Sequence, residues 1–190
     1  GIMESTRLVF FPKMLFRVGD KMFLESRIKA TDSGLLKVFT FPLISGDVHT
    51  ALRDPHSIIL SEKLAKKYFG DVNPVGRTIA VENKYPFTVS AVMKDIPKNS
   101  VFSTANQSWL GIDAIIPYSF LKEIGMTDDS WGNNNIFTFV LLDKGADIKS
   151  IDKQLTAIVV EHNPETNAKF FLYPWLDFRL HFTFGFGEGK

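Results

Sequence analysis

The chain has 190 residues, 45% hydrophobic and 23% charged, so it can bury a sizeable core and is not expected to be disordered. Its 22 basic and 21 acidic residues nearly cancel, which argues against a nucleic-acid-binding protein. With no cysteine, disulfides, thiol catalysis and thiolate metal sites are excluded, and the 18 Phe residues favour a Phe-rich core over a hydrophobic ligand pocket.

Residues 13–30 are expected to form a hairpin, with Gly19-Asp20 as its two-residue turn. Alternation predicts one face of the second strand to carry Met22, Leu24, Ile28 and Ala30. The run Thr31-Asp32-Ser33 then offers caps for a short helix, and Gly46-Asp47 closes a turn. The apolar residues expected on that helix are Leu35, Leu36 and Phe39.

The stretch 57–93 carries the clearest local instructions. Its start, Ser57 to Leu60, is typical of a buried strand, and Ser61 suits the N-cap of a helix that begins at Glu62. Gly70 predicts the end of that helix, because a helix often stops at a residue tolerant of left-handed geometry. The residues expected on the buried helix face are Leu64, Ala65 and Tyr68, with Phe69 beside them.

A turn and a hairpin should follow this helix. Pro74 and Gly76 favour the turn, and residues 82–84 form the polar turn of the hairpin. Alternation places one apolar face on the second strand: Tyr85, Phe87, Val89, Ala91 and Met93. The sequence therefore predicts a half-buried antiparallel ribbon.

Residues 94–111 read as a polar surface loop broken by Pro97. A short strand is expected at 112–116, and Pro117 suits the start of a helix that stops at Gly125. Residues 136–142 are apolar on both faces, which predicts an interior strand.

The last part of the chain should hold the longest helix. Asp147 is its expected N-cap, and the helix should end before Asn163-Pro164. A final strand is expected at 169–174. Helical spacing is kept by Ile148, Ile151, Leu155, Ile158 and Val159.

Two segments together resemble a known family. IILSEKLAKKYFGDVNPVGRTI followed by FTVSAVMKDIPKNS is similar to the extracytoplasmic core domain of MacB-like ABC transporter permeases, which show a strand, a helix ending in a YFG-like tripeptide, a proline turn and a ribbon in this order. The chain departs from that pattern at Ser90-Ala91, where a glycine is common.

The resemblance implies an α+β fold with mixed or antiparallel sheets, strand-helix units and two lobes, over residues 1–190. An inserted lobe is expected at about 71–129. It also implies a non-catalytic periplasmic domain of an inner-membrane protein, in which ATP hydrolysis by a separate cytoplasmic domain or subunit drives export or extraction of a substrate. The implied partners are that ATPase, reached through membrane helices, a second permease subunit and other envelope proteins. No apolar run here approaches the roughly 20 residues of a membrane span.

Chemistry-bearing motifs are weak throughout, so no catalytic, cofactor or metal residue is predicted. The four histidines, His49, His56, His162 and His181, show no metal-binding spacing and are interpreted as surface or loop residues. Ser57 and Ser61 fit strand-edge and cap roles better than a nucleophile elbow.

Three other patterns in the sequence could indicate a binding site. The tail GFGEGK lacks the spacing of a phosphate loop, and Asp128, Asp129 and the three following asparagines, Asn133, Asn134 and Asn135, favour turns over calcium binding. Trp131 fits either a partner contact or a plug at the lobe boundary. The alternative function is a ligand-binding or sensor module of another membrane receptor, which needs polar groups converging in an apolar pocket.

Overall fold

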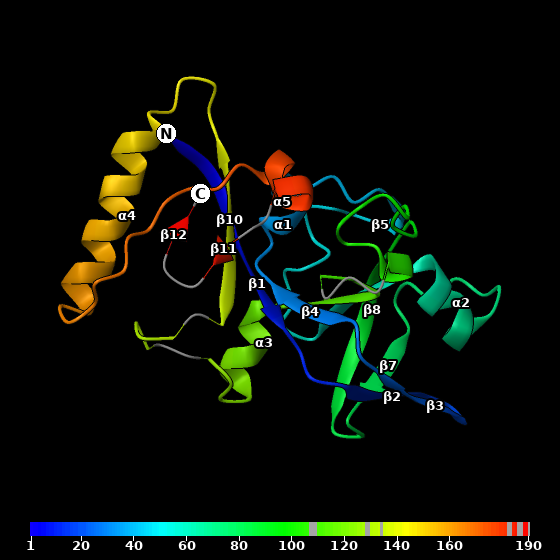
Figure 1. Cartoon of the computed structure of the whole chain (residues 1–190). Helices are drawn as coiled ribbons and strands as arrows, with labels where there is room; N and C mark the ends of the chain where they lie inside the picture. The colour runs from blue at the N-terminus through cyan, green and yellow to red at the C-terminus, as the bar shows by residue number, and fades with distance from the viewer. Residues whose placement is uncertain (107–109, 128–129, 134, 182–183, 186–187, 190) are drawn as a thin grey trace. The chain divides into compact units, whose positions relative to one another are not determined.

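The structure is a computed structural model that describes residues 1–106, 110–127, 130–133, 135–181, 184–185 and 188–189 (Figure 1). The chain divides into two compact units. The larger unit consists of Ile2–Asp128 and Asn134–Leu142, and the smaller unit of Gly1, Asp129–Asn133 and Asp143–Lys190.

One mixed sheet organises the larger unit. Its strands follow the order β10-β1-β4-β9-β6-β8-β7-β2-β3, and β5 also pairs with β8. The pairs β4–β9 and β6–β8 are parallel, and the other pairs are antiparallel. The strands are β1 (Ile2–Phe10), β2 (Met14–Val18), β3 (Lys21–Glu25), β4 (Ile28–Thr31), β5 (Leu43–Gly46), β6 (Ser57–Ser61), β7 (Thr78–Val81), β8 (Tyr85–Met93), β9 (Ala114–Pro117) and β10 (Ile136–Leu142).

Short helices connect these strands. They are α1 (Leu35–Val38), α2 (Glu62–Phe69), α3 (Tyr118–Glu123) and the 3₁₀ turn η1 (Thr104–Asn106). Together with the mixed sheet they make an α+β fold, as the sequence predicts. The inserted lobe expected at about 71–129 stays a prediction; residues 71–128 belong to the larger unit, where β8 pairs with β6 and β9 with β4.

The stretch from β6 through α2 to β8 forms as its sequence predicts. The Ser61 hydroxyl accepts a hydrogen bond from the backbone N–H of Leu64 at 3.2 Å and caps α2. The helix ends at Gly70, which has a φ of 64°. The buried residues of the helix are those expected: Leu64, Ala65 and Tyr68.

Strand β8 has a bulge at Ser90, where the family pattern commonly has glycine. Val89 pairs with Ile58 and Ala91 with Ile59, so Ser90 has no partner on β6. Its hydroxyl lies 2.7 Å from the carbonyl oxygen of Ala51 and 3.1 Å from that of Ile58. The serine side chain therefore adds hydrogen bonds to the segments at Ala51 and Ile58 that a glycine could not make.

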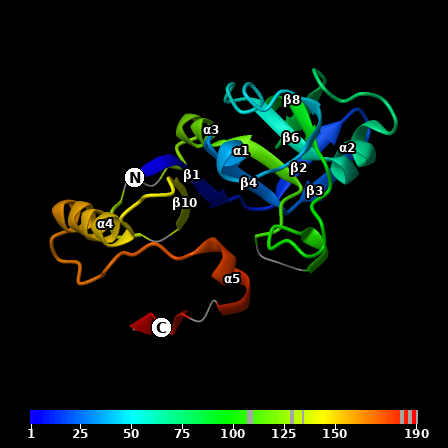
Figure 2. The ribbon, with the colours of Figure 1, turned by 90° about the horizontal axis from the view of Figure 1, so that it is seen from above.

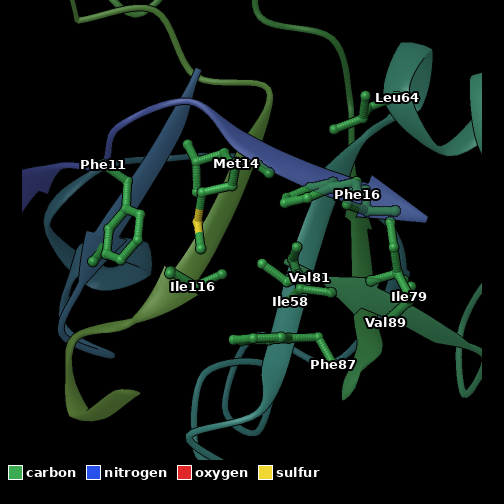
Figure 3. Packing of buried hydrophobic residues seen from close by; sticks show 14 of the residues in the cluster. Phe11, Met14, Phe16, Ile58, Leu64, Ile79, Val81, Phe87, Val89 and Ile116 are labelled. Carbon is green, nitrogen blue, oxygen red and sulfur yellow. The ribbon is translucent and has the colours of Figure 1, made fainter. Parts of the chain in front are cut away.

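The core contains large apolar side chains from many strands (Figure 3). Phe16, Phe87 and Phe120 are fully buried, and the rings of Phe87 and Phe120 meet edge to face at 4.8 Å. A second aromatic cluster contains Phe39, whose ring lies 5.0 Å from that of Phe102, together with Phe41 and Phe139. The Phe-rich core predicted from composition is confirmed.

The hairpin expected at 13–30 is shorter than predicted. The Gly19-Asp20 turn joins β2 to β3, but the chain then leaves β2, and β4 pairs with β1 and β9. One predicted face is thus divided between two strands. Ile28 is buried in the centre of the sheet, whereas Met22 is 53% exposed at its end.

The cap predicted for α1 is wrong. Gly34 is the N-cap residue and makes no side-chain cap. Asp32 does not cap the helix either, because its carboxylate accepts hydrogen bonds from the backbone and guanidinium of Arg7 on β1. Strand β1 has no counterpart among the elements expected from the sequence.

The loop at 94–111 is a surface segment only in part: residues 94–99 are mostly exposed, as expected, but its second half is not. Phe102, Ser103 and Leu110 are all buried. The backbone N–H of Ile112 also bonds to the Phe102 carbonyl at 3.1 Å. This segment therefore covers part of the core, and its polar composition concealed the buried residues.

Strand β10 lies at one end of the strand order, not in the interior as predicted. Its apolar residues on both faces are mostly half-buried. Phe139 joins the second aromatic cluster, and Phe137 meets Phe10 edge to face at 5.6 Å. The apolar residues on both faces of β10 are therefore explained by packing on each face, although β10 has a neighbouring strand on one side only in the described sheet.

The smaller unit contains α4 (Ile148–His162), capped by Asp147 as predicted, and α5 (Trp175–His181). Residues 169–174 are not a strand, because the segment bonds to α4 side chains instead: Thr156 exchanges hydrogen bonds with Phe170. A two-stranded ribbon, β11 (Phe184–Gly185) and β12 (Glu188–Gly189), follows. No helix in the described part of the chain combines the length and apolar character of a membrane span.

Candidate functional site

A surface pocket of about 240 Å³ lies beside α2 in the larger unit. Its walls come from the end of β3, from one side of α2 and from the residue just before β9. The lining residues are Glu25, Lys63, Leu64, Lys67 and Asp113. Two cations therefore face two carboxylates across a small space.

The local structure explains how these residues meet. Lys63 and Lys67 are four residues apart on α2, so they lie one turn apart on the same side of the helix. Glu25 is the last residue of β3, and Asp113 immediately precedes β9. Both residues line the pocket beside α2. No local pattern in the sequence predicts this group, because its members are distant in the chain.

Glu25 is the most connected of the lining residues. Its Oε1 atom accepts a hydrogen bond from Lys67 Nζ at 2.6 Å and another from the Tyr68 hydroxyl at 2.7 Å. Burial and this hydrogen bond raise the pKa of Tyr68, so the phenol stays a donor. Lys67 Nζ also lies 4.1 Å from the centre of the Phe23 ring.

The surroundings of Asp113 shift the pKa of its carboxyl. Burial raises the pKa of its carboxyl, and the charges of Lys63 and Arg27 act in the opposite direction. The backbone N–H of Lys63 donates to Asp95 Oδ1 at 3.0 Å. The lining therefore holds one ion pair, Lys67 with Glu25, and a second cation and carboxylate, Lys63 and Asp113, whose charges influence each other.

This arrangement lacks the parts of a catalytic site. The lining contains no serine, threonine, cysteine or histidine, and within the described residues no three His, Asp or Glu side chains are grouped to hold a metal. The pocket is also smaller than the roughly 300–1,000 Å³ typical of ligand sites. We interpret it as a charged surface depression that stabilises the contact between β3 and α2.

The histidines are not brought together. His56 lies in a loop, where Nε2 is 2.8 Å from Glu123 Oε2 and the ring packs against both Phe87 and Phe120. His49 lies in an exposed turn, and His181 is the last residue of α5.

His162, the last residue of α4, stacks on Trp131, with ring centroids 4.0 Å apart. Both residues belong to the smaller unit, and Trp131 is 46% exposed. Among the acidic and asparagine residues interpreted as turn-forming and not calcium-binding, Asp128, Asp129 and Asn134 lie outside the described part of the chain. The GFGEGK tail is described only at 185 and 188–189, where it forms the β11–β12 ribbon.

A second surface feature is the end of the sheet. Strand β3 carries three consecutive exposed apolar residues: Met22 is 53%, Phe23 42% and Leu24 59% exposed. Figures 1 and 2 show β3 beside β2 and near α2. Such a run on a strand is unusual, because end strands usually carry charges that discourage pairing.

Comparison with known families decides the identity. The model of the MacB-like periplasmic core domain matches residues 5–158, from β1 through most of α4. The chain belongs to this family. It is a MacB-like periplasmic domain of the kind found in ABC-type transporter permeases. No curated protein matches the chain.

Solved structures share the fold of this MacB-like domain. A domain of a protein described as a permease, from Porphyromonas gingivalis, is 22% identical with a TM-score of 0.69, over 96% of this chain and 81% of that one. The extracellular domain of the noncanonic ABC-type transporter YknZ from Gram-positive bacteria is 19% identical, with a TM-score of 0.63 over 91% and 82%. The periplasmic region of MacB from Actinobacillus actinomycetemcomitans is 20% identical, with a TM-score of 0.61 over 84% and 67%.

Proposed function

We propose that this MacB-like domain is the non-catalytic extracytoplasmic part of an inner-membrane ABC permease. In this proposal it couples ATP hydrolysis in a separate cytoplasmic ATPase to export or extraction of a substrate on the outer side of the membrane. Its partners are that ATPase, reached through membrane helices, a second permease subunit and other envelope proteins. The observation that supports the proposal is the family match over 5–158, which includes every strand of the ten-stranded sheet.

The construction of the sheet supports a mechanical role. All residues of β4, β9 and β6 are buried, so the middle of the sheet is packed on both faces. Packed interiors have low compressibility and transmit displacement instead of absorbing it. In this proposal the larger unit, which holds the sheet, moves as one body when a membrane helix pulls on it.

The sensor alternative receives no comparable support. It requires polar groups converging in an apolar pocket, whereas the pocket beside α2 is small, four of its five lining residues are charged, and Lys67 is paired with Glu25.

A single spin label tests the coupling directly. These 190 residues contain no cysteine, so once any cysteine elsewhere in the permease is replaced, Met126→Cys provides one attachment point, and Met126 is 50% exposed. In the full-length permease with its ATPase, we expect the distance between the two labels of a permease pair to change between the nucleotide-free and ATP-bound states. A hydrolysis-deficient ATPase should hold the ATP-bound distance, and the permease without ATPase should show no change.

An unchanged distance in the complete complex would refute the coupling. The same variant also reports sidedness. A membrane-impermeant maleimide should label Met126→Cys in intact spheroplasts, and labelling only after lysis would refute the extracytoplasmic location.

A further inference from the structure

Strand β3 presents an open edge. In the described part of the chain it pairs only with β2, in continuous register from Met14↔Glu25 to Val18↔Lys21. Hydrogen-bonded pairs alternate from the two-residue turn, so Phe23 directs its backbone groups at β2. Met22 and Leu24 then direct their backbone groups outward, away from the sheet.

The usual protection of an edge strand is missing here. Natural edges carry a bulge, a proline or a charge in the middle of the strand. The register of β3 has no bulge, and its central residues, Met22, Phe23 and Leu24, are apolar and exposed. Its charges, Lys21 and Glu25, stand at the two ends.

The sequence of β3, Lys-Met-Phe-Leu-Glu, is complementary to itself in the antiparallel direction. Around a two-fold axis at Phe23, Lys21 of one copy lies opposite Glu25 of the other, twice, and Met22 lies opposite Leu24. Moving the axis to Met22 places Lys21 opposite Phe23 and loses both charge pairs. Opposite charges across a ladder stabilise it and like charges destabilise it.

The hydrogen-bonding phase is compatible with this register. The outward backbone groups belong to Met22 and Leu24, and in this register each of these residues faces the other across the axis. They form hydrogen-bonded pairs, and Phe23 faces its own copy in a non-hydrogen-bonded pair. Charge, apolar contact and backbone phase therefore agree on one arrangement.

We propose that two copies of this chain associate through β3, antiparallel and centred on Phe23, so that their sheets join into one. The contacts with α2 stay in place, because Lys21 Nζ reaches the Tyr68 carbonyl at 2.9 Å and Glu25 stays bound to Lys67. One five-residue ladder buries far less than the roughly 1,200 Å² of a stable interface. The association is therefore weak, and covalent trapping is the suitable measurement.

Phe23→Cys provides the first test. The non-hydrogen-bonded pair brings the two Cα atoms to about 4.5 Å, within the range of about 4.4–6.8 Å that a disulfide spans. Under mild oxidation of the 190-residue chain, we expect about tenfold more disulfide dimer than for Met126→Cys. The control is matched, because Met126 is 50% and Phe23 42% exposed.

A mixture tests the register. Met22→Cys and Leu24→Cys should each cross-link weakly alone and strongly when mixed, because Met22 of one copy faces Leu24 of the other. Equal cross-linking of the single variants and the mixture would overturn the proposed register.

The double variant Phe23→Cys/Leu24→Pro tests the ladder itself. Proline at position 24 removes an outward N–H and no bond to β2, so the midpoint of urea unfolding should stay close to that of Phe23→Cys. Dimer formation should fall to the level of Met126→Cys. Cross-linking that survives the proline, or that matches the control in Phe23→Cys, would overturn the proposal and leave a different protein as the occupant of this edge.

Discussion

The centre and one end of the same sheet are built in opposite ways. Every residue of β4, β9 and β6 is buried, whereas four of the five residues of β3 are exposed and Glu25 is half-buried. Both regions are rich in apolar residues, so composition does not distinguish them. The difference is in what covers them: strands and packed segments at the centre, and only β2 and one side of α2 at the end.

This contrast separates two uses of apolar side chains. At the centre they stabilise the fold, because burial removes them from water. At β3 they add little stability and stay available to a partner. Three comparisons follow: two set a closely packed position against the end of the sheet, and one follows the pH dependence of a buried charge.

The largest effect is expected for Phe87→Ala. Phe87 is fully buried on β8 and packs against Phe120, so the free energy of unfolding should fall by about 3–5 kcal/mol. Phe23→Ala removes the same atoms from an exposed position and should cost less than about 1 kcal/mol. Urea unfolding measures both, and equal losses would contradict the division between centre and end.

Gly46→Ala should be next in size. Gly46 has a φ of 93°, and a Cβ there would lie 2.4 Å from the Ser90 carbonyl oxygen and 2.5 Å from the Ala91 Cβ. We expect a loss of about 2–3 kcal/mol from strain and overlap. Gly19→Ala, in the β2–β3 turn, has a φ of 56° with nothing within 4 Å, and strain alone should cost about 1 kcal/mol. Similar melting temperatures for the two variants would show that the bulge accommodates a methyl group.

Lys29 gives the smallest and most pH-dependent effect. Burial, helped by the charge of Arg27, lowers the pKa of Lys29 to about 8, and its Nζ lies 4.5 Å from the centre of the Phe10 ring. The unfolded chain holds this proton up to about pH 10.4. Between those values the unfolded state binds more protons, so stability should rise with pH, by about 1–2 kcal/mol.

Lys29→Met removes that titration. Below pH 8 the wild type holds a charge in the middle of the sheet, and the variant should be more stable there. The gap should narrow as the pH rises toward 10. Urea unfolding of both proteins at pH 7, 8, 9 and 10 measures it, and a constant gap would contradict the burial of the charge.

The sequence predicts structure well where neighbouring residues determine it. In the stretch from β6 to β8, cap, helix stop and alternation are local signals, and Ser61, Gly70 and Phe87 all take their expected places. It predicts less where the outcome depends on distant partners. Asp32 is a good cap by type, but Arg7 on another strand binds it.

Exposure and strand order also depend on distant segments. Met22 and Ile28 belong to one alternating pattern, yet only Ile28 reaches the centre, because the chain changes partner between β3 and β4. The charged pocket could not be predicted for the same reason, because Glu25 and Asp113 are distant in the sequence and line one pocket only in the folded chain. The absence of a catalytic, cofactor or metal residue stays a prediction.

The pairing of β1 with β10 has a consequence for how the chain is made. Ile2–Phe10 finds its ladder partners in Ile28–Thr31 and in Ile136–Leu142, so the first strand of the sheet to be synthesised waits for the last strand of that sheet. Contacts between such distant segments slow folding, because the loop between them must close first. Until β10 is made, the edge of β1 that pairs with it has no partner in this sheet, and such unpaired edges favour aggregation during synthesis.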